Sequence, residues 1–241
     1  MSRNKVSYFG MIWIMLIYCG ISMQSDGWCL EASEGTDGKA GVQQGQPIYR
    51  PPLRGMPFSR EGGATRGDKD SLAVITALVP EHIGLTSIDM PVLYWHASRA
   101  VEVPIEFAII DDNAIEPLYQ VSMKPPFAAG YHAVRLQDGL CKLELHKVYK
   151  WFIAMVVDSQ HRSRDIVVSG AIERVKLSDQ LRSRIQQASL FDQISMYADA
   201  GIWFDAVDCL NRFVEEQKGS ATALKLREDF FRQVGLTLKT D

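Results

Sequence analysis

The densest group of reactive side chains in the sequence lies in the run DSQHRSRD, from Asp158 to Asp165. A histidine oriented by a carboxylate can act as a general base, and a neighbouring serine can act as a nucleophile. His161 would be the base, oriented by Asp158 or Asp165, and Ser163 would be the nucleophile. One hypothesis is therefore an extracytoplasmic hydrolase or carbohydrate-active enzyme that uses Asp158, His161 and Asp165.

The same residues also fit a structural role. Asp158 and Asp165 can end strands by accepting hydrogen bonds from nearby backbone N–H groups, and Arg162 can pair with one of them. No glycine-flanked nucleophile turn surrounds Ser163, and residues two apart on a loop rarely align as nucleophile and base. The sequence favours the structural interpretation and predicts no catalytic residue.

Other possible ligand groups are scattered along the chain. Asp111, Asp112 and Glu116 could bind calcium, but a hairpin turn with the sequence DDNA explains them without a metal. The other histidines show no spacing typical of a metal site, and no Cys-x-x-Cys pair occurs. The sequence therefore predicts neither a metal nor a cofactor.

Two long strands must position the Asp158–Asp165 segment. Apolar residues alternate with other residues on both sides of it, over residues 148–157 and 165–175. Five shorter runs of the same kind come earlier, at residues 72–79, 92–97, 103–110, 115–123 and 131–136. Seven strands over about a hundred residues are typical of immunoglobulin-like domains. We therefore expect a seven-stranded, antiparallel, immunoglobulin-like β-sandwich over residues 70–177.

One of these runs carries a proline. Pro104 lies near the start of the strand expected at residues 103–110. Because proline cannot donate a hydrogen bond to a neighbouring strand, this position needs an unpaired side. We expect this strand to lie at the edge of a sheet.

From Ser178 onward the apolar spacing becomes that of helices, and Ser178 itself can cap the first one. The run Tyr197–Leu210 resembles the centre of a tetratricopeptide repeat, in which Gly201 ends one helix. We expect a mainly β fold with a tetratricopeptide-like helical hairpin at residues 178–241. Because a single such unit cannot bury its own apolar face, the helices should dock on the sandwich or on a partner.

An adjacent aromatic pair in this helical region has two interpretations. Trp203 and Phe204 could form a ridge that docks on a partner. Alternatively, Trp203 fills the seam between the helices and Phe204 packs against the sandwich. The sequence favours the second interpretation.

The N-terminal region has the layout of an export signal. Arg3 and Lys5 precede an apolar run that extends from Tyr8 to Met23. Residues 1–32 are therefore predicted to be a signal peptide or, if uncleaved, an N-terminal membrane anchor. We expect an extracytoplasmic protein, periplasmic or secreted, that contacts a membrane only through this segment.

Residues 33–69 are rich in glycine, glutamine, proline and charged residues, which predicts a flexible arm. Arg54, Arg60 and Arg66 lie among its glycines and could meet an anion. The arm lacks the Gly-Lys-Ser/Thr sequence of a phosphate-binding loop. An extended arm lying across the sandwich edge is the simpler interpretation.

The net charge argues against one class of partner, and the cysteines leave two interpretations open. A net charge of −3 gives no reason to expect nucleic acid as a partner. Cys141 and Cys209 fall in segments expected to fold, and an oxidising compartment would permit a disulfide between them. They could equally be small buried apolar residues.

Four segments together resemble a family of exported bacterial proteins, mainly cyanobacterial, known as domain of unknown function 928. They are RGMPFSREGGATRG from Arg54, ITALVPE from Ile75, YKWFIAMVVDSQHRSRDIVVSGAIERVKL from Tyr149 and MYADAGIWFDAVDCL from Met196. The resemblance implies export and a two-part layout, and it implies no reaction.

The family pattern also bears on the arm. Members of the family often carry cysteines where this sequence has Asp68 and Val157. The resemblance implies a disulfide in those members that ties the arm to the sheet. Here the arm must be held in another way.

A sandwich with appended helices offers exposed strand edges and a helix groove, which are common platforms for protein binding. We therefore expect a non-enzymatic interaction or assembly protein whose partner is another envelope or secreted protein. The alternatives are the hydrolase described above and a ligand-sensing module for a membrane signalling partner. The candidate contact residues are Arg162, Asp165, Trp203, Phe204, Arg54, Arg60 and Arg66.

Overall fold

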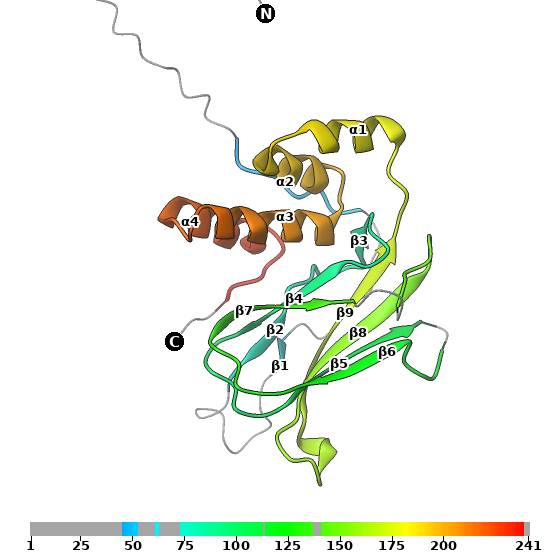
Figure 1. The fold of residues 1–241 in the computed structure, drawn as a ribbon, viewed down its shortest axis with the longest axis vertical. Helices are drawn as coiled ribbons and strands as arrows, with labels where there is room; N and C mark the ends of the chain where they lie inside the picture. The colour runs from blue at the N-terminus through cyan, green and yellow to red at the C-terminus, as the bar shows by residue number, and fades with distance from the viewer. Residues whose placement is uncertain (1–44, 53–60, 63–72, 113, 137–140, 239–241) are drawn as a thin grey trace, which may run out of the picture. The chain divides into compact units, whose positions relative to one another are not determined.

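The computed structural model describes residues 45–52, 61–62, 73–112, 114–136 and 141–238 (Figure 1). This part of the chain is mainly β, with nine strands in two sheets followed by four helices, which confirms the expected fold class at that level. The strands are β1 (Glu61–Gly62), β2 (Ile75–Ala77), β3 (Gly84–Thr86), β4 (Val92–Ala97), β5 (Ile105–Asp111), β6 (Tyr119–Met123), β7 (Gly130–Arg135), β8 (Val148–Met155) and β9 (Ile166–Arg174). The helices are α1 (Asp179–Gln187), α2 (Leu190–Asp199), α3 (Trp203–Glu216) and α4 (Ala221–Arg232), and a short 3-10 helix, η1 (Arg162–Arg164), lies between β8 and β9.

The long hairpin of β8 and β9 is the centre of the larger sheet. Alternate residues of β8 are buried, as the period-two pattern of the sequence predicts. The two strands pair antiparallel along their whole length, so that Trp151 stands opposite Gly170. A Cβ atom at Gly170 would lie 2.7 Å from Val79 and 3.0 Å from the Trp151 ring. Glycine at this position therefore permits the close contact of these side chains with the strand.

The two sheets have different strand orders. The larger sheet has the order β3-β9-β8-β5-β6, and the smaller has the order β1-β2-β4-β7. Among these strands only β3 and β9 pair in parallel. Ile75 and Leu93 of the smaller sheet share one hydrophobic core with Phe107 and Ile153 of the larger sheet. Burial of these apolar faces holds the sheets together.

The strand expected at residues 103–110 lies inside the larger sheet and not at its edge. β5 begins at Ile105 and is paired on both sides, with β6 and with β8, so the prediction of an edge strand is wrong. Pro104 lies just before the strand, where it needs no donor, and its carbonyl oxygen accepts a hydrogen bond from Val156 N at 2.9 Å. The short strands β1 and β3 were not predicted.

The helices begin and turn where the sequence indicates. Ser178 caps α1 by accepting a hydrogen bond from Leu181 N. Gly201, between α2 and α3, has a positive φ of 73°, and a Cβ atom there would lie 2.8 Å from Arg50 O. Glycine is required at this turn for both reasons.

The helices dock on the end of the two sheets through α3 (Figure 1). The Trp203 ring is fully buried, and its Nε1 donates a hydrogen bond to Leu78 O at 2.9 Å. Tyr94 of β4 donates from its hydroxyl group to Asp208 at 2.9 Å. Trp203 also stacks on Phe230 of α4, with ring centroids 5.3 Å apart. Sheets and helices therefore share one hydrophobic core.

Residues 46–52 belong to the segment predicted as a flexible arm, but they pack on the helices. Tyr49 is buried, and its backbone N donates to Gln233 at 2.8 Å. Arg50 N donates to Ala198 O at 3.0 Å, and its side chain pairs with Asp199 at 2.9 Å. An aromatic ring buried in the core fixes this piece of chain. Further along the same segment, β1 pairs with β2, so a strand pairing holds this part of the arm.

Cys141 and Cys209 are both buried and both free, so they do not form the disulfide considered above. Burial raises the pKa of each thiol, which is typical of inert cysteine in an apolar environment. None of the helices in the described residues is long and apolar enough to span a bilayer.

Candidate binding pocket between the sheets and the helices

The Asp158–Asp165 turn is organised by its own hydrogen bonds. Asp158 accepts from Gln160 N at 2.9 Å and contacts the His161 ring at 2.8 Å. The bond from Gln160, followed by that from His161, lowers the pKa of Asp158. Arg162 bonds to Asp165 at 2.7 Å. These contacts match the structural interpretation, in which carboxylates end strands and Arg162 pairs with one of them.

Arg162 also ties the turn to the larger sheet. Its two terminal nitrogens donate to the two carboxylate oxygens of Glu106 in β5, at 3.1 and 2.6 Å. Together with the bond from Nε to Asp165, this forked geometry engages all three nitrogen atoms of the guanidinium group. Arg162 and Asp165 therefore bind each other and the sheet, rather than presenting free groups to a partner.

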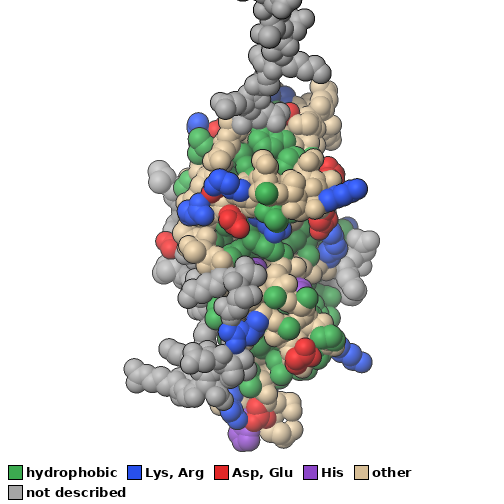
Figure 2. Space-filling model, turned by 90° about the vertical axis from the view of Figure 1, so that its left-hand side faces the viewer, with side chains coloured by type: hydrophobic (Ala, Val, Ile, Leu, Met, Phe, Trp, Pro, Cys, Tyr) green, Lys and Arg blue, Asp and Glu red, His purple; other side chains and the backbone are tan. Residues whose placement is uncertain are grey.

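The turn does not form a cleft. Residues 159–164 are exposed, and they line none of three pockets in the described part of the chain, which lie at the helices and the segments packed on them. Basic, acidic and histidine side chains gather on the surface at the lower end of Figure 2, the end that lies away from the helices in Figure 1. The geometry therefore brings Asp158 and His161 together but gives them no enclosed place for a substrate.

The other predicted contact residues are either buried or lie outside the described residues. Trp203 and Phe204 are buried in the core, so the interpretation as a docking ridge is wrong and the core assignment holds. Arg54, Arg60 and Arg66 lie outside the described residues. None of these residues is therefore placed at a surface site.

The acidic pair considered for calcium has other partners. Asp111 pairs with Lys147 at 2.5 Å, and Asp112 pairs with Lys150 at 2.6 Å. Within the described part of the chain, no group of three histidine, cysteine or acidic residues is placed to hold a metal ion. These lysine pairs account for the two aspartates.

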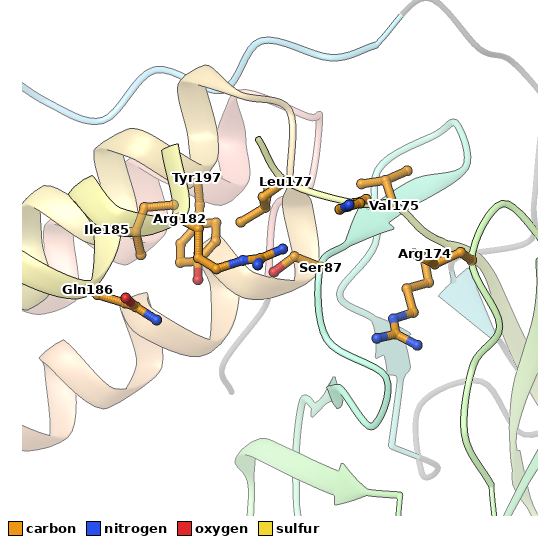
Figure 3. A pocket seen from close by; sticks show the side chains of 10 residues that line it. Ser87, Arg174, Val175, Leu177, Arg182, Ile185, Gln186 and Tyr197 are labelled. Atoms are coloured by element: carbon orange, nitrogen blue, oxygen red, sulfur yellow. The ribbon is translucent and has the colours of Figure 1, made fainter. Parts of the chain in front are cut away.

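A different site lies where the larger sheet meets the helices (Figure 3). It is a cavity of about 380 Å³, which falls within the usual range for ligand pockets. Its walls come from the end of β9 and the following linker, from α1 and α2, from the turn after β3 and from the segment before β8. The lining residues are Ser87, Leu145, Arg174, Val175, Lys176, Leu177, Arg182, Ile185, Gln186 and Tyr197.

All the charged residues that line this pocket are basic. Arg174 ends β9, Lys176 follows in the linker, and Arg182 projects from α1 toward Ser87 (Figure 3). Arg182 has one acidic neighbour, Asp179, at 3.5 Å, but both side chains are largely exposed and such pairs are weak. The pocket therefore favours an anion.

The Ser87 side of the pocket is fixed by a buried carboxylate behind it. Asp205 of α3 accepts from the Thr86 hydroxyl group at 2.7 Å, from Ser87 N at 3.1 Å and from the Ser87 hydroxyl group at 2.5 Å. Burial raises the pKa of Asp205 to about 6, although these hydrogen bonds act to lower it. The Tyr197 hydroxyl group is hydrogen-bonded to Ser87, and burial raises the pKa of Tyr197 to about 12, so the phenol stays neutral. The polar wall is thus held rigidly.

This pocket was not predicted from the sequence, although one signal points to it. The run RVKLSDQLRSR, from Arg174 to Arg184, holds four basic residues and one acidic residue at the boundary between strands and helices. The register of a strand end and a helix start can bring such residues to one side. Tyr197 and Ser87 come from distant segments, and no local pattern identifies them.

Comparison with known proteins gives a family and no activity. None of the curated proteins matches this chain. The family described as Domain of Unknown Function (DUF928) matches residues 61–240, which is most of the sequence, and the resemblance noted from the four segments is confirmed. The chain therefore belongs to the DUF928 family.

Proposed function

We propose that this protein is a non-enzymatic recognition module of the cell envelope, and that the pocket between the sheets and the helices is its binding site. The observation that carries the proposal is the lining of that pocket, in which three cations and two hydroxyl groups face an apolar wall. Ligand sites commonly combine an apolar lining with a few fixed polar groups. A partner would be recognised by an anionic group that it inserts here.

The size of the pocket limits what enters it. A cavity of about 380 Å³ lies near the lower end of the range for small-ligand pockets, so it can hold only a small part of a partner protein. The pocket therefore takes a terminal segment or a small molecule. The rest of any partner would lie across the surrounding surface, where Leu145, which lines the pocket, is an exposed apolar side chain.

We also interpret the two sheets as an immunoglobulin-like sandwich. The order β9-β8-β5-β6, facing β2-β4-β7, with β3 parallel to the last strand, supports this interpretation. The packing of α2 against α3 around Gly201 supports a tetratricopeptide-like hairpin. Both architectures serve widely as binding scaffolds.

The envelope location rests on the export-type N-terminal segment, residues 1–32. The alternative function, a hydrolase or carbohydrate-active enzyme that uses Asp158, His161 and Asp165, has less support because residues 159–164 of that turn are exposed and its charged groups are engaged with one another. An enzyme normally needs an enclosed site that excludes water. The recognition module is therefore the better-supported function.

A capture experiment tests the proposal. The full chain is cross-linked in its own envelope fraction and compared with two single variants, Arg182→Gln and Arg184→Gln. Both variants remove one positive charge from the exposed surface of α1, but only Arg182 lines the pocket. We expect the stoichiometric partner to be recovered with Arg184→Gln and to fall by about tenfold with Arg182→Gln. Equal recovery with the two variants would contradict the proposal.

A further inference from the structure

We infer that the ligand of this pocket is a carboxylate attached to an apolar group, a chemistry found at the C-terminal residue of a partner protein and in a free short-chain acid. This inference rests on the proposed function, because it names the group that the pocket would recognise. Three features of the lining support it: the fixed guanidinium group of Arg174, the basic side chain of Arg182 opposite it, and the apolar wall.

The first feature is the guanidinium group of Arg174. Its Nη1 donates to Leu143 O at 2.9 Å, which fixes the orientation of the group. Its Nε is buried and has no hydrogen-bond partner among the described residues. That atom is closed to a ligand, so Arg174 acts on the pocket through its fixed positive charge. A positive charge held at the wall favours a negatively charged ligand such as a carboxylate.

The second feature is the opposite wall. Figure 3 shows Arg182 beside Ser87 and Tyr197, across the pocket from Arg174. The Ser87 hydroxyl group donates to Asp205, so on this wall the partly exposed guanidinium group of Arg182 is the donor that can bind a carboxylate. Asp205 lies behind Ser87 and is fully occupied by the donors of Thr86 and Ser87, so its carboxylate is shielded from the ligand.

The third feature is the apolar part of the lining, formed by Leu145, Val175, Leu177 and Ile185. Ile185 and Leu177 are buried and form a small cluster of their own with Leu85 and Ile202. A hydrated phosphate or sulfate would leave this wall in contact with water, whereas an aliphatic or aromatic group would cover it. The volume of 380 Å³ holds about a dozen water-sized groups, which suits one apolar residue with its carboxylate.

The known source of such a group in a protein partner is the end of its chain. Capture of a terminal carboxylate is an established way of recognising peptides. A free acid of similar size presents the same two features. Peptides and a free acid are therefore tested side by side.

The experiment measures binding to the purified full chain by isothermal titration calorimetry. The probes are a pentapeptide that ends in leucine with a free carboxylate, the same peptide with a C-terminal amide, and hexanoate. We expect the free-carboxylate peptide or hexanoate to bind, and the acid to bind about tenfold more tightly than the amide. Equal affinity for acid and amide would overturn the inference.

Variants locate the binding site. In the double variant Lys176→Gln/Arg182→Gln, the preference for acid over amide should fall to less than about twofold, and Arg184→Gln should retain it. Both substituted residues are exposed, so the fold should be preserved, and circular dichroism checks this. An acid preference that survives the double variant would place the carboxylate elsewhere and overturn the inference.

The outcomes also separate this inference from the proposed function. Binding of hexanoate that displaces the peptide supports the shared chemistry and shows that free acids can supply it. If none of the three probes binds while Arg182→Gln still abolishes partner capture, the carboxylate inference fails and the recognition module stands. If neither probe binding nor capture depends on Arg182, both fail.

Discussion

Asp205 is the residue that most directly links the helices to the pocket. It lies in the first turn of α3, is buried, and accepts hydrogen bonds from the Thr86 and Ser87 side chains and from the Ser87 backbone. A buried carboxylate is tolerated only when its oxygen atoms are satisfied in this way. The turn after β3 therefore keeps Ser87 in place only while Asp205 is present.

The titration of Asp205 predicts a pH dependence of stability. Burial raises its pKa from 3.8 to about 6 in the folded protein, so the folded state binds the proton more tightly than the unfolded chain does. The contribution of Asp205 to the free energy of unfolding is therefore full below pH 4 and falls as the pH rises to about 6. The difference between the two pKa values corresponds to about 3 kcal/mol.

The variant Asp205→Asn isolates this effect. It cannot titrate, so the stability of the wild type relative to the variant should fall by about 2 kcal/mol from pH 4 to pH 7; the change is smaller than the full value of about 3 kcal/mol because Asp205 of the unfolded chain is already largely ionised at pH 4. Urea unfolding of both proteins at four pH values and constant ionic strength measures the difference. Because all other acidic groups are common to both proteins, their titrations cancel. A stability difference that stays constant or grows with pH would contradict the raised pKa of the buried Asp205 carboxyl group.

At the level of elements, α3 is the connection between the two parts of the chain. Its residues Trp203, Phe204 and Asp205 all face the sheets, and Gly84 of β3 lies so close that an added Cβ atom would meet the Phe204 ring at 2.6 Å. The helices are therefore not an independent appendage. A chain that ends at Lys176 would expose the apolar surface that Trp203 now covers.

Removal of the Trp203 side chain should destabilise the whole fold. We expect Trp203→Ala to lower the free energy of unfolding by about 3–5 kcal/mol, because it leaves a cavity between α3, α4 and the sheets. Trp203→Phe keeps an aromatic ring but leaves Leu78 O without its donor, and should cost about 1–3 kcal/mol.

The same unfolding curves test the coupling of the elements. Helical and strand signals in circular dichroism should change together in one transition for the wild type and both variants. Helices that melt first, with the strand transition unchanged in Trp203→Ala, would show that the two parts fold separately.

On the scale of the whole molecule, the sequence predicted the order of elements well. Period-two patterns located β8 and β9, and Ser178 marked the first helix, because both signals are local in the chain. The edge position expected for Pro104 was wrong because strand pairing is decided by the whole sheet. The burial of Tyr49 was missed because two of the rings that pack on it, Trp203 and Phe230, lie more than a hundred residues away in α3 and α4.

The candidate site also depends on contacts between distant residues, which local sequence patterns do not predict. Sequence reasoning singled out the dense run at Asp158–Asp165, whose charged side chains pair mainly among themselves. The pocket instead combines Ser87, Leu145 and Tyr197 with seven residues that lie between positions 174 and 186. The packing of α3 on its neighbours and the parallel pairing of β3 with β9 bring Ser87 and Tyr197 close to those residues.

The most direct test of a recognition site in this pocket is photo-cross-linking from a defined residue in the native envelope. A photoreactive amino acid replaces Gln186, which lines the pocket, or Gln160, an equally exposed glutamine in the turn away from the helices. The account predicts a discrete cross-linked product from position 186 and none from position 160. A product from position 160 alone, or equal products from both positions, would contradict it.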